Sequence, residues 1–302
     1  MIFDHFNKLM KHMDPWLLGL LFKVNSWLKA FIKQVKIDLT QILQVMKFEV
    51  QLHKIRFIII TIISIFLMVF SGFLPTILLP FGFISDSPYL FFTMSLSLFS
   101  FLAPLFSCLL FSGVICTEYK RNVGFLRLPV LKKHQILIGK FLGNYFLTLI
   151  LVAIIYTMMT VFSFLFYGPP IVLTPIISFM FLSLFLLAYC SIVTFLSSFM
   201  PSALSVIITA LALFLFGFGI LQSIGQAIFP ELEPLYSLMY VFNIVTVSVQ
   251  PDFMDQERVY VDPETNYHFW SFPTVEGALL TLIIYFLVSI TLAYIIFRRR
   301  RG

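Results

Sequence analysis

The sequence predicts an all-α integral membrane protein with six transmembrane helices, preceded by a long amphipathic helix that lies at the membrane surface. Of the 302 residues, 60% are hydrophobic and only 11% are charged, whereas soluble domains carry about 25% charged residues. In addition, residues 57–85, 87–117 and 141–230 contain no Asp, Glu, Lys or Arg. A helix needs about 20 apolar residues to cross the ~30 Å hydrocarbon core, so these three runs limit the number of spans.

The spans are expected to be helices. The uncharged runs are apolar on all sides, whereas the strands of a membrane β-barrel alternate between polar and apolar residues. High hydrophobicity excludes a disordered chain, and three cysteines are too few for a disulfide-rich secreted module.

Residues 1–56 are expected to form a cytoplasmic N-terminal segment, with an amphipathic helix at about residues 16–48. Pro15 stands where a helix start tolerates proline. One predicted face is apolar and includes Leu20, Val24, Trp27, Leu28, Phe31, Val35, Leu39, Ile42 and Met46. The opposite face is polar and includes Lys29, Lys33, Lys36, Thr40, Gln44 and Lys47. Such a helix suits the lipid headgroups of the inner leaflet; its apolar face can instead, or in addition, pack on another protein.

The transmembrane domain is expected at residues 57–297, with a basic tail at residues 298–302. We expect its six spans at about residues 57–79, 90–115, 141–167, 171–196, 203–228 and 275–297. Turn signals separate them: Pro80 and Gly82, a Gly-Pro-Pro at residues 168–170, and a serine-rich break at residues 197–202. Pro104 is expected to kink the second span.

The basic residues set the predicted orientation. Of the 20 Lys and Arg residues, nine precede the first span, six lie in the loop at residues 116–140, and four end the chain. The loop at residues 229–274 carries seven acidic residues and a single base, Arg258. Because positive residues favour the cytoplasmic side, both termini and the loop at residues 116–140 are predicted to be cytoplasmic, and the acidic loop to face outward.

The sequence offers no site for catalysis. No charge lies at the centre of a predicted span, and Glu276 is interpreted as an interfacial carboxylate at the outer edge of the sixth. The five histidines are scattered, so no metal site is expected. The single Gly-Lys pair, Gly139-Lys140, lacks the rest of a phosphate-binding loop. We therefore expect no enzyme and no cofactor in this chain, and a transport role needs energy from a partner or passive conduction.

Polar side chains inside the spans are candidates for lining a translocation pathway. These are Ser95, Ser97, Ser100, Asn144, Ser205 and Thr209. The alternative is that such groups only bond a backbone carbonyl or a neighbouring helix.

The loop between the second and third spans carries a resemblance to a known family. An acidic residue after span two, a glycine, a leucine-rich stretch, a proline with following bases, and a Gly-Lys before span three occur in order. The residues that supply them are Glu118, Gly124, Leu126, Leu128, Pro129, Lys132, Lys133, Gly139 and Lys140. In this order of features the sequence resembles the permease subunits of ABC-2 type transporters.

The resemblance implies the membrane-spanning subunit of an ATP-driven exporter in the plasma membrane. It implies a dimer of permeases, of like or unlike chains, and a separate ATP-binding subunit that holds ATP and Mg²⁺. It also implies that the loop contacts that subunit through Glu118, Lys120, Arg121, Gly124, Pro129, Lys132, Lys133 and Lys140. The alternative for the bases is that they only set the topology of the chain.

The other partners expected are membrane lipids, and no nucleic acid. The alternative function is a membrane scaffold or assembly protein that recruits partners through the N-terminal amphipathic helix. The transported substrate stays open.

Overall fold

The computed structural model describes residues 15–78, 88–119, 131–167, 173–250, 252–261 and 268–299. Five long helices are α2 (Pro15–Leu78), α3 (Pro88–Phe111), α4 (Lys133–Tyr167), α5 (Leu173–Phe199) and α9 (Val275–Arg299). A sixth rod consists of α6 (Ala203–Ala212), a π-helical turn (Leu213–Gly217) and α7 (Phe218–Ile228). These six are long and apolar enough to cross a membrane, which confirms the predicted fold class.

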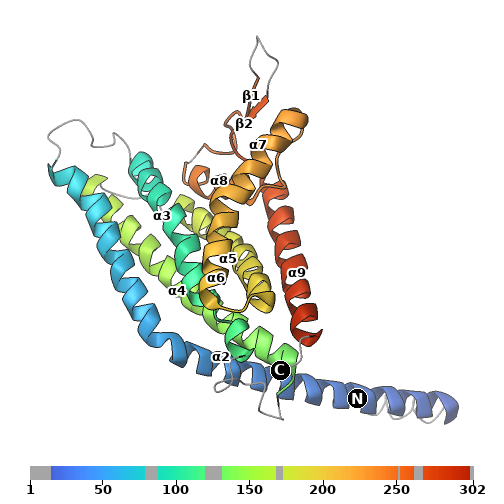
Figure 1. The fold of residues 1–302 in the computed structure, drawn as a ribbon. Coiled ribbons are helices and arrows are strands. Elements are labelled where there is room, and N and C mark those ends of the chain that lie inside the picture. The colour runs from blue at the N-terminus through green and yellow to red at the C-terminus, as the bar shows by residue number, and fades with distance from the viewer. Residues whose placement is uncertain are drawn as a thin grey trace, which may run out of the picture.

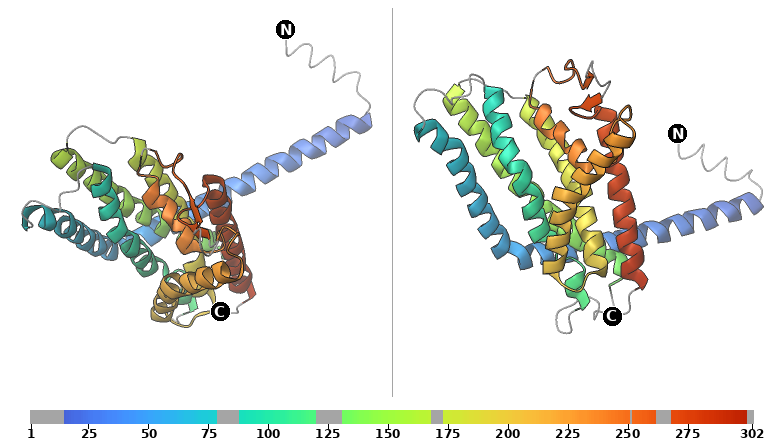
Figure 2. Two further views of the ribbon diagram at one scale, coloured as in Figure 1. Left: turned by 90° about the horizontal axis from the view of Figure 1, so that it is seen from above. Right: turned by 45° about the horizontal axis from the view of Figure 1, so that its top comes forward.

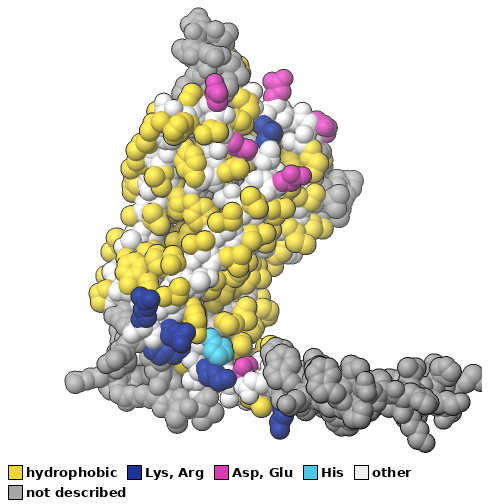
Figure 3. Space-filling view, turned by 90° about the vertical axis from the view of Figure 1, so that its right-hand side faces the viewer, with side chains coloured by type: hydrophobic (Ala, Val, Ile, Leu, Met, Phe, Trp, Pro, Cys, Tyr) yellow, Lys and Arg dark blue, Asp and Glu magenta, His cyan; other side chains and the backbone are white. Residues whose placement is uncertain are grey.

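The two ends of the helix bundle differ in charge. At one end, called here the basic end, lie Lys132, Lys133, Arg298 and Arg299. At the other, the acidic end, lies the segment between α7 and α9. Figure 3 shows most acidic side chains at one end, most basic ones at the other, and hydrophobic side chains covering the surface between them. This band is the surface expected of a bundle that contacts lipid.

Helix α2 joins two elements that the sequence analysis treated separately. The amphipathic segment and the first span form one helix of 64 residues. Its first part lies across the basic end, and its second part runs beside α4 toward the acidic end (Figures 1 and 2). No Gly or Pro occurs from residue 20 to residue 71, so nothing in the chain ends the helix between the two parts.

Helix α5 lies at the centre of the bundle. It packs against α3, α4, α6, α8 and α9. An aromatic cluster of Phe185, Tyr189, Phe214 and Phe242 joins α5 to the π-helical turn and to α8, with ring centroids 4.7 to 6.4 Å apart. Tyr189 also donates a hydrogen bond to the carbonyl of Ala210 (3.3 Å). The centre of the protein is therefore a packed core.

The exit from α3 is fixed to α5. The backbone N–H groups of Ile115 and Cys116 donate to Ser197 Oγ, each at 3.1 Å, and Ser197 Oγ donates to the carbonyl of Ser112 (3.0 Å). The chain then forms a short 3₁₀ helix, η1 (Cys116–Tyr119). This arrangement places Glu118 against the bundle.

Helix α4 begins earlier than the sequence suggested. The third span was expected to start at Phe141, but α4 starts at Lys133. Its first two turns therefore come from residues that were assigned to the loop. Lys140 lies inside the helix, and its side chain is buried.

The acidic end contains one short helix and a small hairpin. Helix α8 (Leu238–Val247) has a buried apolar face, and strands β1 (Val259–Val261) and β2 (His268–Trp270) pair in antiparallel fashion with Tyr260 opposite Phe269. Trp270 Nε1 donates to the carbonyl of Pro230 (3.1 Å), which ties the hairpin to the end of α7. The sequence analysis did not predict these strands.

Candidate functional site

Charged side chains are buried together at the basic end, where α2, η1 and α4 meet. Glu49 and His53 come from α2, Glu118 from η1, and Lys140 and Asn144 from α4. Each of the five residues is at most 7% exposed. Buried charges are stable only when they are paired and hydrogen-bonded, so the geometry of this buried charge cluster matters.

Lys140 lies between two carboxylates from different elements. Its Nζ is 2.7 Å from Glu118 Oε1 and 3.6 Å from Glu49 Oε2. Glu49 Oε2 accepts no hydrogen bond, so Lys140 is the cation that compensates this oxygen. The ammonium group therefore links η1 to α2 through α4.

The other two members hold Glu49 in place. His53 Nε2 lies 3.2 Å from Glu49 Oε1, and Asn144 Nδ2 donates to the same oxygen at 3.3 Å. Asn144 Nδ2 also donates to the carbonyl of Lys140 (3.0 Å). The Glu49 carboxylate of α2 thus contacts Lys140 and Asn144, which lie one turn apart on α4.

Two glycines let α2 and α4 approach closely beside the charges. A Cβ on Gly139 would lie 2.7 Å from Val45 Cβ and 2.9 Å from the carbonyl oxygen of Ile42. A Cβ on Gly143 would lie 3.1 Å from the carbonyl oxygen of Met46. Gly139 and Gly143 form the glycine spacing that brings membrane helices together. Close backbone approach brings Glu49 within reach of Lys140 and Asn144.

Gly139→Ala is expected to destabilise the protein by about 1–3 kcal/mol, because its Cβ must displace Val45 or the backbone of α2. The measurement is thermal unfolding of the purified protein in detergent. The matched control is Gly219→Ala in α7, where the new Cβ would lie 3.6 Å from Met239 Sδ, an ordinary contact. The control is expected to be neutral or slightly stabilising, because alanine favours a helix over glycine. Equal effects of the two changes would contradict the close packing.

A second contact joins the start of α4 to the surface part of α2. Asp38 Oδ1 accepts from Gln135 Nε2 (2.8 Å) and Gln34 Nε2 (2.9 Å), and lies 3.5 Å from Lys132 Nζ. The backbone N–H of Lys132 in turn donates to Gln135 Oε1 (2.8 Å). The loop therefore re-enters the bundle directly on α2.

The start of α4 also contacts the end of α9. Lys133 Nζ donates to the carbonyls of Phe297 and Arg298, both at 3.2 Å, and lies 5.7 Å from the centre of the Phe297 ring. A cation at these last carbonyls compensates the negative end of the helix. Motion at the start of α4 would therefore act on α9 as well as α2.

Half of the predicted loop residues lie in this region. Glu118 and Lys140 form the ion pair, while Lys132 and Lys133 contact α2 and α9. The remaining four, Lys120, Arg121, Gly124 and Pro129, lie outside the described residues.

Sequence reasoning missed Glu49 and His53. Both lie between the predicted amphipathic helix at about residues 16–48 and the predicted first span, in a stretch that was expected only to belong to the cytoplasmic segment. A signal was nevertheless present, because Asp38, Val45 and Glu49 are spaced by seven and four residues and so share one helix face. A carboxylate on the face that otherwise packs inward indicates a buried partner.

The candidate pathway residues are distributed over several helices. Asn144 belongs to the buried charge cluster, and Ser95 is buried on α3. Ser205 accompanies Ser202 in capping α6. Ser97, exposed on α3, donates to the carbonyl of Met94, and Thr209 is half-buried on α6. The backbone of Ser100 lies in α3. Their role in a pathway stays a prediction.

Within the described part of the chain, no group of three or more His, Cys, Asp or Glu side chains is placed to hold a metal ion. The buried charge cluster is instead an arrangement for joining helices.

Comparison with known proteins agrees with the arrangement of spans and loop. No curated protein sequence matches the chain significantly. The sequence model of the family described as "ABC-2 family transporter protein" matches residues 6–301, nearly the whole chain. The protein therefore belongs to the ABC-2 transporter family and is a multi-pass membrane protein of the permease type.

Proposed function

We propose that the protein is the membrane-spanning permease subunit of an ATP-driven exporter, and that a separate subunit binds and hydrolyses ATP. The observation that carries this proposal is the Glu118–Lys140–Glu49 connection, in which both ends of the loop at residues 116–140 enter one buried charge cluster with α2. A force applied to that loop by an ATP-binding subunit reaches two long helices at once.

The coupling step follows from this geometry. The ATP-binding subunit contacts the loop, including Lys120, Arg121, Gly124 and Pro129. Nucleotide-driven movement of the loop shifts η1 and the start of α4. Because Lys140 joins η1 to α2 and Lys133 joins α4 to α9, these elements shift together. Packed helices respond to such a force by moving as bodies.

The remaining parts of the proposal rest on the family and on the charge distribution. Two permease copies, alike or different, form the translocation pathway and move outward a substrate that is still to be identified. The basic end faces the cytoplasm, because positive residues favour that side. The surface part of α2 lies along the inner leaflet of the plasma membrane, where lysines meet anionic headgroups. ATP and Mg²⁺ are held by the partner, not by this chain.

The test is co-purification with an ATP-binding subunit, followed by measurement of ATP hydrolysis in nanodiscs. The first partner to test is any ATP-binding subunit whose gene is found next to that of the permease. The wild-type permease is expected to bind that subunit and to change its hydrolysis rate. Glu118→Lys places a second cation beside Lys140 and is expected to remove this effect while the protein still inserts in the membrane.

A matched control is Glu231→Lys, the same charge reversal at the exposed acidic end. It is expected to leave hydrolysis unchanged. If no ATPase associates with the wild-type permease, or if Glu118→Lys and Glu231→Lys behave alike, coupling through this loop is wrong. Retention of other membrane proteins by the amphipathic helix alone would then favour the scaffold function.

A further inference from the structure

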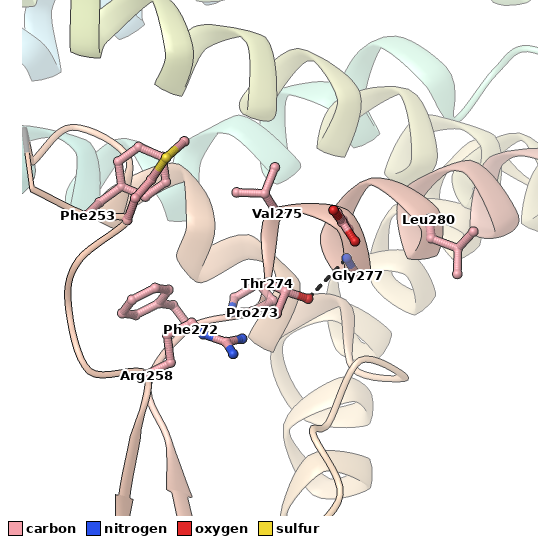
Figure 4. A pocket seen from close by; sticks show the side chains of 10 residues that line it. Phe253, Arg258, Phe272, Pro273, Thr274, Val275, Gly277 and Leu280 are labelled. Atoms are coloured by element: carbon pink, nitrogen blue, oxygen red, sulfur yellow. Dashed lines mark hydrogen bonds between the residues drawn. The ribbon is translucent and has the colours of Figure 1, made fainter.

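A cavity of about 660 Å³ lies at the acidic end, where the β1–β2 hairpin meets the start of α9 (Figure 4). Its wall includes two charged and several apolar side chains: Phe253, Met254, Arg258, Phe272, Glu276 and Leu280. This cavity is far from the buried charge cluster, at the opposite end of the bundle, and the proposed coupling does not use it.

Arg258 is held in the wall but keeps hydrogen-bonding capacity. Its backbone carbonyl accepts from the N–H of Ser271 (2.9 Å), next to the β1–β2 ladder. Its buried Nη1 makes no hydrogen bond and lies 3.8 Å from Glu233 Oε1, while the side chain as a whole is 37% exposed, so the rest of the guanidinium group is accessible to a ligand. That carboxylate oxygen already accepts from the N–H of Thr274 (2.9 Å) and from the hydroxyl of Tyr240 (3.3 Å). The guanidinium group is therefore only partly compensated.

The start of α9 adds a second positive feature. Thr274 Oγ1 accepts from the N–H of Gly277 (3.1 Å) and so caps the helix, as the dashed line in Figure 4 shows. The first N–H groups of a helix have no partner within it, and they carry the positive end of the helix dipole. In Figure 4, Arg258 points toward the segment at residues 272–274 that leads into this helix end. An anionic group in the cavity would therefore lie near both the Arg258 guanidinium group and the N-terminus of α9.

Glu276 supplies a separate negative charge in the same wall. It is exposed, and within the described residues it makes no hydrogen bond or ion pair, including with Arg258. The cavity thus presents a cation and an anion that do not compensate each other.

The apolar side of the cavity continues as an exposed apolar stripe along the outer face of α9. Phe253 and Phe272 are buried in the wall, and Leu280 is 62% exposed at its edge. Ile284 and Leu287 follow Leu280 on the same face of α9 and are also exposed. This stripe leads from the cavity along the surface that contacts lipid chains.

We propose that the cavity binds a zwitterionic phospholipid with an ethanolamine headgroup. The phosphate binds Arg258 and those N–H groups in the first turn of α9 that Thr274 does not cap, the ammonium group donates to Glu276, and an acyl chain lies along Leu280, Ile284 and Leu287. Glu276 would repel a lipid whose headgroup is only anionic, and Arg258 would repel a cationic amphiphile. The bound lipid would join the hairpin to α9.

The test uses the full-length protein without any ATPase, so it is independent of the proposed transport role. The protein is purified from nanodiscs with equal amounts of phosphatidylethanolamine and phosphatidylglycerol, and retained lipids are identified by native mass spectrometry. Wild-type protein is expected to retain the ethanolamine lipid at least about tenfold more strongly. Glu276→Gln is expected to remove that preference, and Arg258→Gln to weaken retention of both lipids.

Two matched controls carry the same charge changes at residues that do not line the cavity: Glu257→Gln, next to Arg258 in the chain, and Arg299→Gln at the basic end. Both are expected to retain the wild-type preference. Because Glu276 is exposed, its substitution does not disturb packing, so the result does not depend on how well the Arg258 variant folds. Equal retention of the two lipids by wild type, or an unchanged preference in Glu276→Gln, would overturn the proposal.

Discussion

Replacing Lys140 with methionine is expected to lower the free energy of unfolding by about 3–5 kcal/mol, the range found when one partner of a buried ion pair is removed. The change leaves Glu49 and Glu118 buried near each other without the cation that lies between them. Methionine fills a similar volume, so the loss comes from charge rather than from a cavity. The measurement is thermal or denaturant unfolding of the purified protein in detergent.

The matched control for this variant is Lys132→Met. The Lys132 side chain is 54% exposed, and its ammonium group lies 3.5 Å from Asp38 Oδ1. Both groups reach water, so the removal of this cation is expected to change stability little. A similar, small effect of both substitutions would show that the buried charge cluster does not hold α2, η1 and α4 together.

The number of spans and their approximate positions were predictable because uncharged apolar runs mark the spans, and turn signals such as the Gly-Pro-Pro at residues 168–170 divide the longest run. Uncharged runs of sufficient length leave the chain no other fold in a bilayer. The continuity of α2 was also readable, since no helix-breaking residue stands between its surface part and its span. It was missed because a change from amphipathic to apolar composition was interpreted as a boundary, although composition decides what surrounds a helix and not where it ends.

The partners of Lys140 could not be predicted in the same way. The sequence placed Glu118 and Lys140 at the two ends of one loop, but Glu49 lies about seventy residues before Glu118, and only the packing of α2 on α4 brings it close. The spacing of Gly139 and Gly143 is a signal of close helix contact that was not used, and it does not identify the partner helix. Local patterns predict that a face is buried, whereas pairing across helices is a property of the tertiary structure.

The cavity at the acidic end could not be predicted from the sequence either. Strands of three residues carry too little alternation to be recognised from sequence. Without the hairpin, Arg258 and Glu276 are only two charges in a polar loop and at a helix start. Pairing of the strands and the cap at Thr274 place both in one wall. The prediction that Glu276 is an interfacial carboxylate did not include Arg258, the cation in the same wall.

Exchanging the two charges of the Glu118–Lys140 pair is expected to restore ATPase coupling only in part. Glu118→Lys alone brings two cations together and is expected to abolish coupling. Adding Lys140→Glu re-forms an ion pair with the same net charge. In the wild-type protein, however, Glu49 Oε2 lies 3.6 Å from the Lys140 ammonium group, so the new carboxylate at position 140 lies close to the Glu49 carboxylate. Like charges at this distance oppose each other strongly when buried.

A third change, Glu49→Gln, is therefore expected to complete the recovery, because an amide can donate to the carboxylate at position 140 and removes the repulsion. The measurement is ATP hydrolysis by the partner subunit with each permease variant in nanodiscs, alongside thermal unfolding. Coupling is expected to fall by at least about tenfold in the single variant, to stay intermediate in the double variant and to approach wild type in the triple variant. Complete recovery in the double variant would mean that Glu49 takes no part, and that the loop acts on α4 without α2. Recovery that requires the third change would instead assign the long helix to the same moving unit as the loop.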